Sequence, residues 1–239
     1  MPPQVIAYPD PTTTIQAAAE LFLREAAHAM ANKDRFSVSL SGGSTPRALY
    51  SLLASPKYVD QVDWSRVDIF WGDERCVPPN HPESDYGMAK TTLLDHLPSH
   101  VYPQIYRLEG EIQPEVAANR YEQVLRDYFS DCPEQSFDLL LLGLGEDVHT
   151  ASLFPGTQPI HETSRWVVAH YVPKLSAWRL TLTPAILNRA QTTVFLVTGV
   201  AKQPALQHLL HSPYSPDEYP AQIIQPVNGR LLILTDQTV

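Results

Sequence analysis

The chain alternates between short apolar runs of strand length and longer segments with the periodicity of a helix. Residues 139–142 are an unbroken run of leucines, which is typical of a central strand buried on both faces. Residues 12–33 carry apolar side chains at helical spacing, among them Ile15, Ala19 and Phe22, and predict an amphipathic helix. This alternation predicts an α/β fold with a mostly parallel sheet that is covered on both sides.

The same pattern places the remaining elements. Further strands are predicted at residues 36–40, 67–71, 104–108, 166–170, 179–182, 193–197 and 231–234. Further helices are predicted at 84–94, 114–129 and 201–210, and one more has Pro46 in its first turn, where a missing N–H costs little. We find no internal repeat, linker or low-complexity tract, so we expect a single domain over residues 1–239.

Composition narrows the classes of function. Hydrophobic residues make up 44% of the 239, which is enough for a substantial core. The formal charge of −9 disfavours nucleic acid or an anionic membrane as the main partner. No apolar run reaches the roughly 18 residues of a membrane span, and residues 1–10 lack the pattern of a secretory signal. Cys76 and Cys132 have no zinc-site spacing, and we expect a reducing, cytoplasmic compartment.

Three unusual loops each follow a predicted strand, at residues 41–46, 72–87 and 143–150. In open parallel sheets, ligands bind outside the carboxyl ends of the strands. We therefore expect these loops to hold the functional residues.

The first loop combines two glycines with two hydroxyl side chains. Gly42 and Gly43 allow a sharp turn and a close approach to a ligand, and Ser44 and Thr45 open the next helix. The free N–H groups of a helix N-terminus suit a phosphate. An ordinary strand-to-helix turn is an equally open reading, since the loop has neither a P-loop lysine nor a dinucleotide motif.

Charged residues mark the second loop and a later segment. Arg75 can bind a phosphate or carboxylate through two parallel hydrogen bonds, and Asp73 or Glu74 can hold it in place. Lys174 and Arg179 are two of only 17 basic residues. The alternative for all of them is a set of solvated surface charges.

The third loop contains a histidine beside an acid at the mouth of a central strand. His149 is suited to proton transfer near neutral pH, and Asp147 can orient it. A helix beginning at Thr150 would offer N–H groups to an oxyanion. The alternative is a purely structural histidine.

Four segments together resemble the 6-phosphogluconolactonase family: SLSGGSTPRALY (39–50), WGDERCVPPNHPESDYG (71–87), GLGEDVHTASLFPG (143–156) and VPKLSAWRLTLT (172–183). The GGSTP and DVHTA segments are also similar to the broader glucosamine-6-phosphate deaminase-like superfamily. The resemblance implies a Rossmann-like, three-layer α/β/α fold. It also implies hydrolysis of 6-phospho-D-glucono-1,5-lactone in the oxidative pentose phosphate pathway, without a metal or cofactor.

Carried over by position, the resemblance implies that His149 transfers the proton and that Asp147 is its partner. The implied substrate and phosphate contacts are Gly42, Gly43, Ser44, Thr45, Asp73, Arg75, Lys174 and Arg179. Two features depart from the family pattern: Val148 stands where glycine is usual, and Leu175-Ser176 stands where Pro-Pro is frequent. A valine with positive φ would be strained, so we expect either an ordinary backbone or a shifted loop there.

Two other functions stay open at this point. One is an amino-sugar phosphate isomerase or deaminase. The other is a sugar-phosphate sensor without turnover, for which Val148 is the sole support. We expect a small sugar-phosphate lactone as the ligand of a monomer or weak homo-oligomer.

Overall fold

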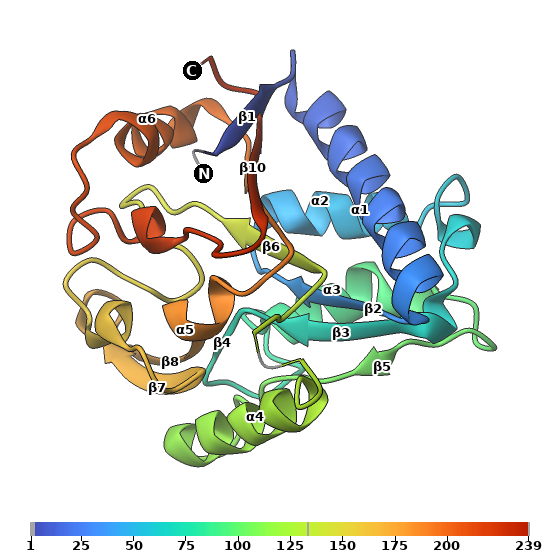
Figure 1. The fold of residues 1–239 in the computed structure, drawn as a ribbon, viewed down its shortest axis with the longest axis horizontal. Coiled ribbons are helices and arrows are strands. Elements are labelled where there is room, and N and C mark those ends of the chain that lie inside the picture. Colours follow the sequence, from blue (N-terminus) through green and yellow to red (C-terminus); the bar gives the residue numbers. More distant parts are fainter. Residues whose placement is uncertain (1–2, 133, 239) are drawn as a thin grey trace.

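The computed structural model describes residues 3–132 and 134–238, and Figure 1 shows its fold. Its strands are β1 (Gln4–Ala7), β2 (Phe36–Leu40), β3 (Val67–Trp71), β4 (Asp73–Arg75), β5 (Gln104–Ile105), β6 (Leu139–Gly143), β7 (Val167–Val172), β8 (Ala177–Leu182), β9 (Thr192–Val197) and β10 (Arg230–Thr235). Its α-helices are α1 (Pro11–Lys33), α2 (Ser44–Leu53), α3 (Asp85–Thr92), α4 (Pro114–Tyr128), α5 (Pro184–Leu187) and α6 (Gln203–His211). Each predicted strand and helix is present at about its predicted position, except the helix expected at Thr150.

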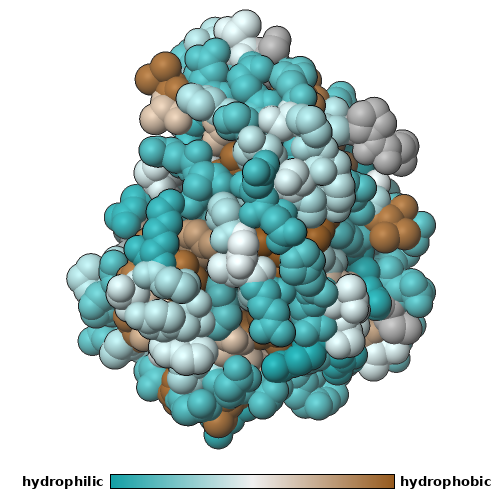
Figure 2. All heavy atoms as spheres, turned by 90° about the vertical axis from the view of Figure 1, so that its left-hand side faces the viewer, coloured by the Kyte–Doolittle hydropathy of each residue, from teal (hydrophilic) through white to brown (hydrophobic). Residues whose placement is uncertain are grey.

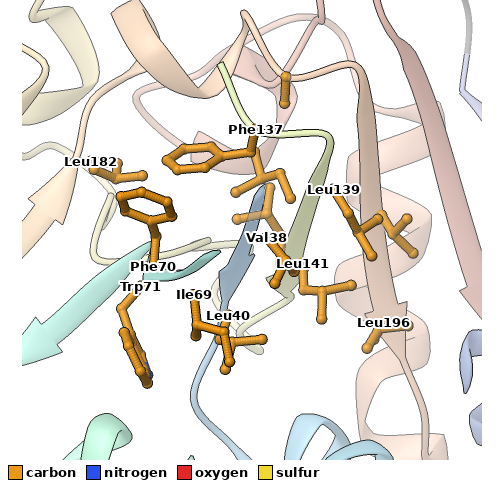
Figure 3. Close-up of a cluster of buried hydrophobic side chains, with 14 of the residues drawn as sticks. Val38, Leu40, Ile69, Phe70, Trp71, Phe137, Leu139, Leu141, Leu182 and Leu196 are labelled. Carbon is orange, nitrogen blue, oxygen red and sulfur yellow. The ribbon is translucent and has the colours of Figure 1, made fainter. Parts of the chain in front are cut away.

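Seven strands of the described chain form one sheet in the order β1-β10-β9-β6-β2-β3-β5, and every neighbouring pair is parallel. This confirms the predicted α/β fold with a mostly parallel sheet. All five residues of β2 are buried, since the strand lies between β6 and β3 and α1 packs against it. Figure 3 shows the core at this point, where Val38 of β2, Leu141 of β6 and Phe70 of β3 lie among other apolar side chains.

The order of the strands brings the three candidate loops together. The chain runs from β2 outward to β3 and β5, and then returns to place β6 on the other side of β2. Such a reversal opens a crevice between the two strands at their carboxyl ends. The loops that follow β6, β2 and β3 therefore leave the sheet at one edge, as the sequence predicted.

A second, three-stranded antiparallel sheet has the order β4-β8-β7. Helix α4 packs against β7 and β8, on the lower side of Figure 1. Strand β4 was not predicted and lies within the long loop expected at 72–87, because Asp-Glu-Arg has none of the apolar alternation of a strand. The register sets Arg75 opposite Arg179, so two separate predicted site residues become neighbours.

Two smaller features also differ from the prediction. Strand β1 was not predicted, and it is a short edge strand paired with β10. Helix α1 begins at Pro11, one residue before the predicted start, and Asp10 caps it by accepting a hydrogen bond from the amide of Thr13 at 2.8 Å.

The face shown in Figure 2 is largely hydrophilic, with hydrophobic residues in small separate spots. Among the helices of the described residues, none has the length and apolar character needed to span a membrane.

Candidate active site

A cavity of about 520 Å³ opens at the carboxyl ends of the central strands. All ten candidate residues from the sequence line it: Gly42, Gly43, Ser44, Thr45, Asp73, Arg75, Asp147, His149, Lys174 and Arg179. They come from the loops after β2 and β6, the first turn of α2, strands β4 and β8 and the turn before β8, so the fold alone brings them together. Their roles in a reaction remain predictions.

His149 and Asp147 form the hydrogen bond that the sequence suggested. The imidazole Nδ1 lies 2.5 Å from Asp147 Oδ1, and Lys174 Nζ lies 2.7 Å from the other carboxylate oxygen. The hydrogen bond from His149, with that from Lys174, holds the pKa of Asp147 well below its usual range. An ionised carboxylate only accepts hydrogen bonds, so the neutral imidazole carries its proton on Nδ1 and leaves Nε2 free as a base.

Phe154 and Gly145 both pack against the imidazole of His149. The ring of Phe154 stacks on it with 4.2 Å between centroids. Gly145 approaches the ring so closely that a Cβ there would lie 2.0 Å from Nδ1. The absence of a side chain at Gly145 is therefore what leaves room for the ring.

The helix predicted at Thr150 is absent, which is a correction. Ala151 has a left-handed backbone with φ of 46°, and the chain turns back through a hydrogen bond from Leu153 N–H to Thr150 O. Thr150 Oγ1 donates to Gly143 O at 2.9 Å. The loop is a compact turn, so no helix N-terminus is available to an oxyanion there.

Val148 has φ of 62°, the left-handed region in which a β-branched residue is strained. Its side chain is nevertheless buried, and Ala221 N–H donates to its carbonyl oxygen at 2.9 Å. Strain of this kind costs about 1–3 kcal/mol, and burial of the valine side chain returns about as much. Valine therefore occupies the backbone expected for glycine, and the neighbouring His149 still reaches Asp147.

We expect Val148→Gly to be at least as stable as Val148→Ala in urea unfolding. Alanine would keep the left-handed strain and lose two methyl groups, whereas glycine would release the strain. Val38 is the control, because it is buried in β2 without positive φ. There the free energy of unfolding of Val38→Gly should be about 1 kcal/mol lower than that of Val38→Ala. The same ranking at both positions would contradict the strain at Val148.

The glycine turn after β2 leads into a helix whose first amides lack a side-chain cap. Gly43 is the N-cap of α2 with φ of 103°, and no side chain accepts a hydrogen bond from the first turn. Tyr50 fixes the backbone of this turn. Its hydroxyl accepts a hydrogen bond from Ser41 N–H at 3.0 Å and donates one to Ser41 O at 2.8 Å. The N–H groups of Ser44 and Thr45 are thus positioned for an anionic ligand.

The acid that holds Arg75 is Asp85, which corrects the prediction of Asp73 or Glu74. Arg75 Nη1 lies 3.1 Å from Asp85 Oδ1 and also donates to the carbonyl of Glu83. Burial lowers the pKa of Arg75, but the nearby carboxylates, Asp85 first, outweigh it and raise the pKa. Asp73 instead accepts a hydrogen bond from Ser152 Oγ at 2.7 Å.

Glu74 is buried under the loop instead of facing the cavity. Its carboxylate accepts hydrogen bonds from the amides of Arg75, Asp85 and Tyr86 and from Ser84 Oγ. Glu74 therefore fixes the start of α3 beside β4.

The remaining basic residues differ in their partners. Lys174 is mostly exposed and bound to Asp147. Arg179 donates to its neighbour's carbonyl, Trp178 O, at 3.2 Å, and burial, followed by the nearby Arg75, lowers its pKa. Among the described residues, Lys202 has no ion-pair partner.

Several further residues that line the cavity had no role predicted from the sequence, among them Asp85, Ser152, Phe154, Thr198 and Lys202. Thr198 and Lys202 follow β9, the neighbour of β6 in the sheet, and Thr198 Oγ1 lies 2.7 Å from Thr45 Oγ1. Their position directly after an apolar strand was the one available signal. Within residues 3–132 and 134–238, no group of three or more His, Cys, Asp or Glu side chains is arranged to hold a metal.

Comparison with known proteins defines the class. Residues 9–233 match the family model for glucosamine-6-phosphate isomerases/6-phosphogluconolactonase, and the chain belongs to this family. It is 37% identical to the 6-phosphogluconolactonase of Nostoc sp. over 95% of this chain and 93% of that protein. It is 36% identical to the 6-phosphogluconolactonase of Synechocystis sp. over 99% of this chain and 97% of that protein.

A solved structure gives the same picture. The 6-phosphogluconolactonase of Trypanosoma brucei superposes with a TM-score of 0.80 at 25% identity, covering 98% of this chain and 95% of that one.

Proposed function

We infer that the chain hydrolyses 6-phospho-D-glucono-1,5-lactone to 6-phospho-D-gluconate in the oxidative pentose phosphate pathway. The observation that carries this is the His149–Asp147 pair, which shares one cavity with the uncapped N-terminus of α2. A pocket that contains both a proton-transfer group and an anion site suits a phosphorylated ester as substrate. The relatives named above carry the same activity in their names.

His149 acts as a general base in this proposal. Its free Nε2 takes a proton from water as the water oxygen bonds to the lactone carbonyl carbon. The bond from that carbon to the ring oxygen then breaks, and the ring oxygen takes the proton from Nε2. The product is an open-chain acid that releases its proton to solvent. Asp147 stabilises the imidazolium between the two transfers.

The substrate phosphate binds at the start of α2. The amides of Ser44 and Thr45 and the positive end of the helix dipole favour an anion. Lys202 lines the same cavity and has no competing carboxylate among the described residues. We therefore add Lys202 to the phosphate contacts proposed from the sequence.

Lys202→Met should raise KM for the lactone by about 10- to 100-fold with a smaller change in kcat, because a hydrogen bond to a charged group contributes about 1.5–3 kcal/mol. The readout is steady-state kinetics with freshly made lactone. Lys90→Met is the matched control, because Lys90 pairs with Asp95 on the surface. An unchanged KM in Lys202→Met would remove this residue from the site.

A coupled assay tests the function itself. A dehydrogenase generates the lactone in the cuvette, and its loss is followed with and without the protein. We expect loss well above the spontaneous rate. Release of ammonia from glucosamine 6-phosphate would indicate the deaminase instead, and tight binding of 6-phosphogluconate without faster hydrolysis would indicate a sensor.

We further propose that the protein works in the cytoplasm as a monomer or weak homo-oligomer, with no nucleic-acid partner. The two free cysteines and the charge of −9 support these points. Sedimentation velocity at several protein concentrations tests the oligomeric state.

A further inference from the structure

Asp85 has no part in the reaction described so far, yet it touches two of the substrate loops. Its side chain is 3% exposed, and its Oδ1 lies 3.1 Å from Arg75 Nη1. The same oxygen packs on Gly42, where an added Cβ would lie 1.8 Å from it. The carboxylate therefore connects the Arg75 guanidinium to the glycine turn that precedes α2.

We propose that Asp85 is a positioning residue that holds Arg75 against the glycine turn and offsets its charge, and so limits affinity for the carboxylate product. This rests on the proposed hydrolysis, which converts an uncharged lactone group into a carboxylate. The product carries one more negative charge than the substrate. An Arg75 without its buried partner would bind that new carboxylate strongly and slow product release.

The position of β4 supports the proposal that Arg75 meets the carboxylate of the product. Ser152 belongs to the segment that follows His149, and its hydroxyl donates to Asp73 Oδ2 at 2.7 Å. This bond ties β4, which carries Arg75, to the segment that carries the catalytic histidine. Asp73 and Arg75 are two residues apart in β4 and so lie on the same face of the strand, and Arg75 lines the same cavity as His149.

The charges around Asp85 are mixed. Asp73, Glu74, Arg75 and Arg179 all act on it. Burial, followed by the charge of Asp73, raises the pKa of Asp85 well above its usual range, while Arg75 and Arg179 act in the opposite direction. The ion pair with Arg75, at 3.1 Å, is the contact that favours the charged form of this buried carboxylate.

The start of α3 is held by side chains other than the Asp85 carboxylate. Glu74 holds the amides of Asp85 and Tyr86, and Ser84 caps α3 by accepting from Gly87 N–H at 3.0 Å. Asp85→Asn keeps the size of the side chain and an oxygen acceptor for Arg75, and it removes the charge. It therefore separates charge from shape.

The test is equilibrium binding by calorimetry with two ligands, 6-phosphogluconate and glucitol 6-phosphate, which lacks the carboxylate. In Asp85→Asn we expect 6-phosphogluconate to bind about 10-fold more tightly relative to glucitol 6-phosphate than in the wild type. The gain should vanish in the double variant with Arg75→Gln. Asp95→Asn is the charge-matched control, since Asp95 is exposed and pairs with Lys90.

Kinetics supply the second readout. The ratio of the product inhibition constant to KM should fall about 10-fold in Asp85→Asn, whereas a merely structural role would raise both constants together. Equal weakening of both ligands, or no change, would overturn the proposal. If Asp85→Asn fails to fold, Arg75→Gln alone must weaken 6-phosphogluconate more than glucitol 6-phosphate. Binding is measured without turnover, so this result is independent of whether the chain hydrolyses the lactone.

Discussion

Replacing His149 with alanine is expected to lower kcat for the lactone by about 10²–10⁴-fold, the usual contribution of a general base. The hydrogen bond to Asp147 orients Nε2 toward the cavity, and no other histidine lines the cavity within the described residues. KM should change little, because the phosphate contacts lie on α2 and beyond β9. The measurement is the coupled assay with the spontaneous opening of the lactone subtracted.

His161→Ala is the control for this loss. His161 is an exposed histidine that also pairs with an aspartate, Asp217, at 2.8 Å. It should keep wild-type activity. Near wild-type turnover in His149→Ala would rule out His149 as the base.

Gly145→Ala is expected to cost nearly as much activity as loss of the histidine itself. The new Cβ would lie 2.0 Å from His149 Nδ1, so the ring must move away from Gly145 and from its stacked position on Phe154. The bond to Asp147 is then broken, and a displacement of about 1 Å at a catalytic group can lower the rate by about 100-fold. Kinetic assays should show a fall in kcat of at least that size.

Gly143→Ala provides the comparison within the same loop. A Cβ there would come no closer than 3.8 Å to Ser41 Oγ, an ordinary contact, and Gly143 does not have positive φ. We expect no more than a few-fold loss. If both alanine variants were equally active, the imidazole would not depend on the gap at Gly145.

The sheet was predictable because its strands are apolar runs with clear ends. Residues 36–40 and 67–71 match β2 and β3 at both ends, since buried parallel strands differ sharply from the polar loops around them. Strand β4 escaped prediction because it is held by its backbone pairing with β8, while its side chains are all charged.

The site was predictable where a residue lies in the segment that follows a strand of the parallel sheet. His149 lies in the loop after β6 and Ser44 follows the turn after β2, and the parallel sheet brings them together. Asp85 could not be found in this way, because its contact with Arg75 depends on how α3 packs beside β4. The helix expected at Thr150 failed for a local reason, the left-handed conformation of Ala151, which nothing in that residue type indicates.

The pairing of β1 with β10 has a consequence for how the chain is made. Residues 4–7 leave the ribosome long before their hydrogen-bonding partners at 232–235. The 143–150 loop also waits for a later segment, because the carbonyl of Val148 bonds to the amide of Ala221. Contacts so distant in sequence form slowly. A nascent chain therefore completes the loop that carries His149 only after residues near 221 have been made.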